Sequence, residues 1–140
     1  MEDIEVTFPG GKRVDAQVGP FVVRTDQPVE AGGTGSVVAP FDLFLASLAT
    51  CAGIYVLGFC QARGLPTEGI RLRQRVEIDS STKLPSHVRL ELTLPASFPD
   101  KYRPAVVRAA EGCKVKKTIA AAPVIDVVVA GTEERLAHAS

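Results

Sequence analysis

This sequence of 140 residues has few cysteines, and they are not arranged for structural bonding. The three cysteines are an odd number, and no two of them form a CxxC pair. A secreted disulfide scaffold needs many paired cysteines and a zinc finger needs regularly spaced ligands, so both classes fit poorly. The two histidines, His87 and His138, show no ligand spacing either. We therefore expect no bound metal ion.

The sequence also has no excess of either charge. Sixteen lysines and arginines balance sixteen aspartates and glutamates. Nucleic-acid and membrane-surface binding rely on clustered cations, so we expect neither partner. The first residues, MEDIEVTF, lack the basic and apolar regions of a secretory signal. We therefore expect a cytoplasmic protein whose thiols are kept reduced.

The composition is that of an ordinary globular chain, with 46% hydrophobic and 23% charged residues. The length predicts a single domain over residues 1–140, large enough to fold without a disulfide. Residues 43–62 form one long run without a charge. We interpret this run as a buried core helix. The alternatives are a membrane span or an apolar helix that packs against another subunit.

Alternating apolar residues and turn signals predict the first elements. Strands are expected at residues 4–8, 14–18 and 21–24, followed by a flexible loop over residues 28–38. The loop contains Gly32-Gly33-Thr34-Gly35 but lacks the Lys-Ser/Thr of a phosphate loop. Pro40 opens the long helix, and Arg63 and Gly64 mark its end.

The second half of the chain predicts two antiparallel strands, a second helical region and a closing strand. The strands cover residues 70–79 and 87–94, each with one apolar and one charged face. Helix is expected over residues 99–122, with a break at Gly112-Cys113, and a strand over residues 124–130. Residues 131–140 are expected to be a frayed tail. This order predicts an α+β domain whose helices cover one sheet face.

The cysteines are the candidate nucleophiles. Cys51 and Cys60 lie nine residues apart in the long helix. At about 100° per residue they face opposite sides, so Cys60 is interpreted as a core thiol. Cys113 follows Gly112 and precedes Lys114, Lys116 and Lys117. A helix start and nearby cations favour a thiolate, so the residues alone point to Cys113 as the more acidic thiol. A small buried side chain at a helix junction explains Cys113 equally well.

Two blocks around these cysteines resemble the OsmC/Ohr family of osmotically inducible and organic-hydroperoxide-resistance proteins. The first block, residues 38–51, reads VAPFDLFLASLATC, and the second, residues 110–115, reads AEGCKV. Residues 122–129 resemble the closing strand of that family. The resemblance implies an α+β fold with a long central helix and an intertwined homodimer whose two active sites use both subunits.

The resemblance also implies a chemistry. Cys51 would attack an organic hydroperoxide and become a sulfenic acid, and Cys113 would resolve it as a disulfide. An external dithiol would reduce the pair, with no metal or flavin. In the peroxidase subgroups a glutamate follows the helix-opening proline and holds an arginine at the cysteine. Here that position is Phe41, and the acidic residue comes one later, as Asp42.

The arginine that would activate Cys51 is taken as Arg24, with Arg13 as the alternative. Asp42 points away from Cys51 along the helix and is interpreted as stabilising the helix start. The candidate substrate wall contains Ser47, Leu48 and Tyr55, which lie one helical turn from Cys51. We therefore expect a thiol peroxidase for organic hydroperoxides. The alternatives are a non-catalytic protein of this fold that binds a small apolar ligand or senses redox state, and a structural domain with inert thiols.

Overall fold

The computed structural model describes residues 1–131 and 135–139. It is an α+β structure with antiparallel sheets, as the sequence predicts. The chain forms two compact units, residues 1–47 and the part from residue 48 onward. The division falls inside helix α1, which covers Pro40–Ala62.

The first unit contains a three-stranded antiparallel sheet of β1 (Ile4–Gly10), β2 (Arg13–Val18) and β3 (Phe21–Thr25). Tight turns join the strands, and Gly11 (φ 58°) and Gly19 (φ 54°) adopt the left-handed conformation that these turns require. All three predicted strands are confirmed.

A buried carboxylate organises the loop that follows β3, in which Val29–Ala31 form the short helix η1. Asp26 is 1% exposed. One oxygen accepts hydrogen bonds from the backbone and hydroxyl groups of Thr34 and Ser36, and the other accepts from the Gln27 N–H. These donors hold the pKa of Asp26 far below its usual range. The predicted loop is present, and Asp26 ties its start to Thr34 and Ser36.

Helix α1 begins at Pro40, as predicted, and ends one residue before Arg63. Gly64 follows in the left-handed conformation (φ 63°), and the Leu65 N–H donates to the Cys60 carbonyl at 2.9 Å. This is the usual way in which a glycine satisfies the last carbonyls of a helix.

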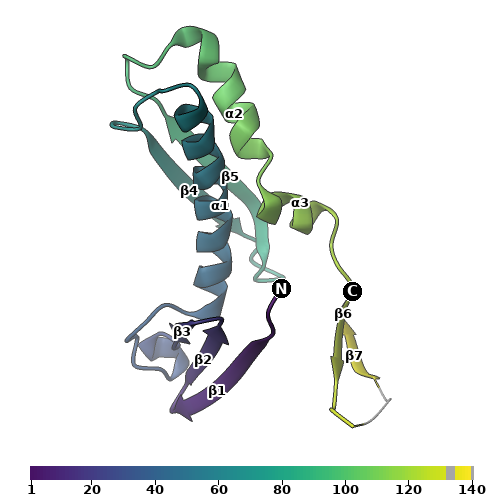
Figure 1. The fold of residues 1–140 in the computed structure, drawn as a ribbon. Helices are drawn as coiled ribbons and strands as arrows, with labels where there is room; N and C mark the ends of the chain where they lie inside the picture. The colour runs from purple at the N-terminus through teal and green to yellow at the C-terminus, as the bar shows by residue number, and fades with distance from the viewer. Residues whose placement is uncertain (132–134, 140) are drawn as a thin grey trace. The chain divides into compact units, whose positions relative to one another are not determined.

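The second unit is built on the antiparallel pair β4 (Arg71–Ile78) and β5 (Pro85–Thr93), with Leu72 opposite Leu92 and Val76 opposite Val88. The short helix η2 (Asp100–Tyr102) leads into α2 (Arg103–Glu111), and α3 (Lys114–Ala120) follows. The predicted break at Gly112-Cys113 is confirmed. Figure 1 shows α1 and α2 side by side over β4 and β5.

Apolar side chains of these elements form two core clusters. The cluster at the C-terminal end of α1 joins Val56, Phe59 and Cys60 to Phe98 and Val106. The other cluster joins Leu48 and Ala52 of α1 to Cys113, with Leu72, Val88 and Leu90 of the sheet packed against it. On the opposite sheet face the charged residues are exposed, and Arg75 and Arg89 both contact Glu91 (3.4 and 3.6 Å). The alternation predicted for both strands is confirmed.

The long apolar helix is only partly covered by the chain itself. Its buried residues are Leu48, Ala52, Val56, Phe59 and Cys60, whereas Phe44 and Ile54 are 43% and 57% exposed. The helix is long and apolar enough to cross a membrane, with 22% of its most apolar window buried. Length and composition of this kind are also found in core helices of soluble folds, and α1 contributes to both core clusters.

The end of the chain is paired rather than frayed. Strand β6 (Ile125–Val128) pairs antiparallel with β7 (Arg135–Ala139), with Ile125 opposite Ala139. The expectation of a frayed tail is thus wrong for residues 135–139, while residues 132–134 and 140 lie outside the described part. The physical reason is that β6 has backbone groups that need partners, and β7 supplies them.

The packing of α2 can be tested with two neighbouring valines. Val106 is fully buried in the cluster at the C-terminal end of α1, whereas Val107 is 46% exposed. We expect Val106→Ala to lower the free energy of unfolding by about 2 kcal/mol, because two buried methyl groups are lost and a void is left. Val107→Ala should change it by less than about 0.5 kcal/mol. Urea unfolding of both variants measures the difference, and equal losses would contradict the packing described here.

Candidate active site

The structure brings Cys51 and Cys113 together although they are far apart in the sequence. Cys113 is fully buried and Cys51 is half-buried, and both are free thiols. They belong to the same apolar cluster, and the Cys113 thiol is hydrogen-bonded to Cys51. The two thiols thus share one site between α1 and the start of α3.

Cys113 stands at the N-cap of α3, where the chain changes direction after Gly112. Its Sγ accepts a hydrogen bond from the Lys116 N–H at 3.2 Å. Side chains that accept in this way satisfy one of the free N–H groups at a helix start. A side chain on Gly112 would be tight, since its Cβ would lie 3.3 Å from the Ala109 carbonyl oxygen. Gly112 therefore suits the close turn between the end of α2 and Cys113.

Cys51 receives hydrogen bonds from this same turn. The Val115 N–H is the strongest of several groups that lower the pKa of Cys51 below its ordinary value. Burial opposes this effect and raises the pKa. The Cys113 thiol, the Lys114 N–H and the positive charge of Lys114 add to the lowering. The sum favours a Cys51 thiolate, which is the reactive form of the side chain.

This environment differs from the expectation that the start of α3 would act on Cys113. That expectation assumed that the N–H groups at the start of the helix act on the residue that begins it. In the structure, the N–H groups of Lys114 and Val115 point to Cys51, and Cys113 serves as the cap. The sequence led us to expect an arginine at Cys51, and the roles of the Lys114 and Val115 N–H groups were missed. The lysines after Cys113 were the one signal available.

Cys60 has the opposite environment. It is fully buried in the other core cluster, and burial raises its pKa. Cys60 is a core thiol, as predicted, and it lies in a different cluster from Cys51.

The three predicted wall residues do not line one cavity. Leu48 is buried beside the thiols and lines a cavity of about 510 Å³ between β5 and the helices α2 and α3. Tyr55 lines a separate groove with Ile54, Gly58, Phe59 and Ala109. Ser47 is exposed, and its hydroxyl donates to the Phe44 carbonyl at 2.7 Å.

The two candidate arginines lie in the first unit and differ in their contacts. The Arg13 guanidinium donates to both oxygens of Asp15, at 2.9 and 3.1 Å. Arg24 in β3 is exposed and has no ion-pair partner within residues 1–131. Asp42 lies in the first turn of α1, as expected, and Phe41 stacks on Phe44 with ring centroids 5.8 Å apart. The role of Arg24 at Cys51 stays a prediction.

Metal-binding residues do not gather anywhere in the described part of the chain. No group of three or more histidine, cysteine, aspartate or glutamate side chains there could hold a metal ion.

The lowered pKa of Cys51 predicts its pH profile of alkylation. We expect the rate at Cys51, followed by peptide mass mapping after iodoacetamide, to have its midpoint below pH 8.5, the ordinary value for a thiol. The thiolate then persists as the pH falls, and the rate drops only through the lowered pKa. Lys114→Met should raise the midpoint slightly, because backbone N–H groups remain. A midpoint at or above 8.5 would contradict this environment, and slow reaction at Cys60 is the internal control.

Comparisons with known proteins agree with the fold. The chain resembles a solved Psychrobacter arcticus 273-4 protein, assigned to the osmotic stress induced and detoxification response. The two are 24% identical, with a TM-score of 0.72, over 84% of this chain and 88% of that one. It also resembles the Legionella pneumophila organic hydroperoxide resistance protein OsmC, described as a predicted redox protein. That match is 20% identical, with a TM-score of 0.54, over 84% and 87% of the chains.

No curated protein matches this chain in sequence. The family model for OsmC-like proteins, in contrast, matches residues 33–128, which include both cysteine blocks and helices α1, α2 and α3. The matched region is more than half of the chain, and the solved structures share its fold. This protein therefore belongs to the OsmC-like family.

Proposed function

We propose that this protein is a cysteine-based peroxidase that reduces organic hydroperoxides in the cytoplasm. The observation that carries the proposal is the arrangement at Cys51. Its thiolate is stabilised by the first turn of α3 and is hydrogen-bonded to a second free thiol, Cys113. Membership of the OsmC-like family supports the same chemistry, and a structural relative is described as an organic hydroperoxide resistance protein.

The reaction follows from the roles of the two thiols. The Cys51 thiolate attacks the terminal oxygen of the hydroperoxide, the one that carries the hydrogen, and the O–O bond breaks. Cys51 becomes a sulfenic acid, and the alkoxide takes up a proton and leaves as an alcohol. The Cys113 thiol then attacks the Cys51 sulfur, so that a disulfide forms and water leaves. An external dithiol reduces the disulfide and returns both cysteines to thiols.

The difference in burial supports the proposed order of the two cysteines. Cys113 is fully buried and Cys51 is half-buried, so a peroxide reaches Cys51 first. The side chains of Leu48, Leu72, Val88, Leu90 and Val115 surround the pair. An apolar shell of this kind favours an alkyl or aryl hydroperoxide over hydrogen peroxide, because only the organic group gains from contact with it.

Exposed apolar surface supports a homodimer as the working form. Strand β6 exposes Ile125, Val127 and Val128 by 54–55% each, and α1 exposes Ile54 and Phe44. Large exposed apolar patches of this kind are typical of protein interfaces. A second subunit would cover them, and Arg24 is our candidate for the arginine that acts on Cys51 in the assembled site.

One observation favours a second function, a non-catalytic protein that binds a small apolar ligand or senses redox state. Phe41 occupies the position where peroxidase subgroups carry a glutamate, and it stacks on Phe44. Without that glutamate, an arginine beside Cys51 would lack the carboxylate that holds it in place. The thiol pair would then respond to oxidants without rapid turnover.

The decisive experiment is a stoichiometric reaction of the reduced protein with cumene hydroperoxide, followed by thiol counting and intact mass. We expect rapid loss of two thiols and the small mass loss of a disulfide. Cys51→Ser should abolish the reaction, whereas Cys113→Ser should trap a sulfenic acid at Cys51. Cys60→Ser is the matched control, because its thiol lies in the other cluster, and it should react like the wild type.

The comparison rate is that of free cysteine under the same conditions. Reaction of Cys51 no faster than free cysteine would rule out the peroxidase and favour the binding or sensing function. Equal reaction of the Cys51→Ser variant and the wild type would assign the chemistry to another thiol.

A further inference from the structure

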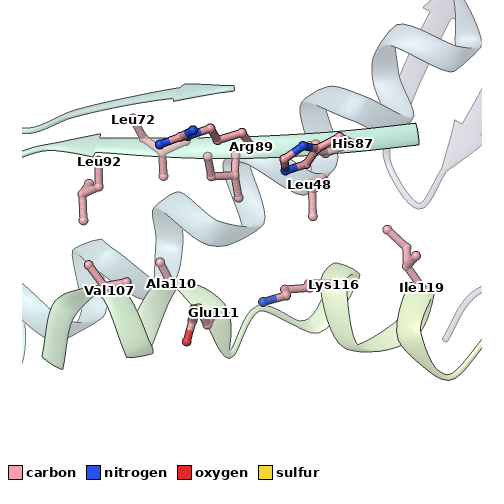
Figure 2. Close-up of a pocket in the computed structure, with 12 residues that line it drawn as sticks. Leu48, Leu72, His87, Arg89, Leu92, Val107, Ala110, Glu111, Lys116 and Ile119 are labelled. Carbon is pink, nitrogen blue, oxygen red and sulfur yellow. The ribbon is translucent and has the colours of Figure 1, made fainter. Parts of the chain in front are cut away.

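The cavity next to the thiol cluster has one chemical property that the proposed peroxidase does not use. Apolar side chains of the sheet line one side and apolar side chains of α2 and α3 line the other, and the polar residues of the lining are His87, Arg89, Glu111 and Lys116. Figure 2 shows Leu72 and Leu92 facing Val107 and Ala110 across it. All lining residues belong to the second unit, so the cavity is complete without the first.

One positively charged side chain from α2 and α3 lines this cavity. Lys116 of α3 lines it, and its side chain lies in the opening between α3 and the sheet (Figure 2). Lys116 has no ion-pair partner within residues 1–131. Glu111 also lines the cavity, but its carboxylate points away from β5 in Figure 2. Arg89 and His87 of β5 also line the cavity, but the Arg89 guanidinium contacts Glu91 at 3.6 Å and the His87 ring lies 4.0 Å from the Glu77 carboxylate.

The combination of an apolar lining and one unpaired ammonium group defines a ligand class. A purely apolar molecule would leave Lys116 without a partner, whereas a carboxylate head would pair with it through charge-assisted hydrogen bonds. A volume of about 510 Å³ lies within the range of small-molecule sites. We propose that this cavity binds a medium-chain carboxylate, with the head on Lys116 and the alkyl chain against Leu48, Val88 and Leu90.

This site adjoins the thiols but does not depend on their chemistry. Leu48, Leu72, Val88 and Leu90 line the cavity and also pack on the Cys51–Cys113 cluster. The alkyl chain of a bound carboxylate would therefore lie on the other side of these side chains from the thiols. Saturated carboxylates have no O–O bond, so their binding can be measured whether or not Cys51 reduces peroxides.

The test is isothermal titration calorimetry of the reduced, full-length protein with hexanoate, octanoate and decanoate, and with 1-octanol as the neutral match. We expect each methylene group to tighten binding about twofold to fourfold, up to the transfer free energy of a buried CH₂. Octanoate should bind about tenfold more tightly than 1-octanol. Lys116→Met should remove that tenfold difference, whereas Lys117→Met, on the same helix but outside the cavity, should keep it.

A second pair of variants tests the location. Val107→Trp should fill the cavity and abolish binding of every carboxylate, whereas Arg108→Trp, on the neighbouring exposed position of α2, should not. Circular dichroism checks that both variants fold. Equal affinity for octanol and octanoate, or octanoate binding that survives Val107→Trp or is unchanged in Lys116→Met, would overturn the proposal. The absence of binding would also overturn it, and if Val107→Trp then dissociates an oligomer, the occupant is a second copy of the chain.

Discussion

The candidate site depends on one constraint, namely that a thiolate in the middle of a helix has no free backbone donors of its own. Every N–H around Cys51 in α1 is committed to the helix, and the neighbouring side chains are largely apolar. Burial alone would raise the pKa of Cys51 and keep it protonated. The chain meets this constraint by bringing a second helix start to the thiol, whose Lys114 and Val115 N–H groups are free to donate. The rest of the second unit holds that start in place.

Several features of the chain contribute to this placement. Gly112 suits the close turn that ends α2, because a Cβ there would lie 3.3 Å from the Ala109 carbonyl oxygen. Cys113 caps α3 through the Lys116 N–H and leaves the N–H groups of Lys114 and Val115 for Cys51. Val115 packs on the same apolar cluster as both thiols. Cys113 therefore has a structural role beside the chemical one that we propose for it, because the helix start that lowers the pKa of Cys51 is the one that Cys113 caps.

The sequence predicts the elements of the fold better than it predicts the site. Alternation in β4 and β5, Pro40 and Gly64 at the ends of α1, and Gly112 between α2 and α3 are local signals, and the structure has each of them. Strand β7 was missed because Arg135–Ala139 has no strand pattern and is defined by its pairing with β6. Cys113 was predicted to be the more acidic thiol because, from the sequence alone, the N–H groups at a helix start were expected to act on the residue that begins the helix. Only the packing of α3 on α1 shows that its donors act on Cys51.

The same packing explains why the thiol site is next to a cavity. Leu48, Val88 and Leu90 must exclude water from the two thiols, yet α3 is short and has no buried residue of its own apart from its cap, Cys113. The helix is held by its first turn, and Lys116 and Ile119 line a space that the core does not fill. Because α3 is packed on the core mainly through its first turn, the core does not fill the space beside its later residues. The packing that lowers the pKa of Cys51 therefore also leaves the apolar space beside it, and Lys116, which has no ion-pair partner within residues 1–131, is the group from which we infer a preference for an anion.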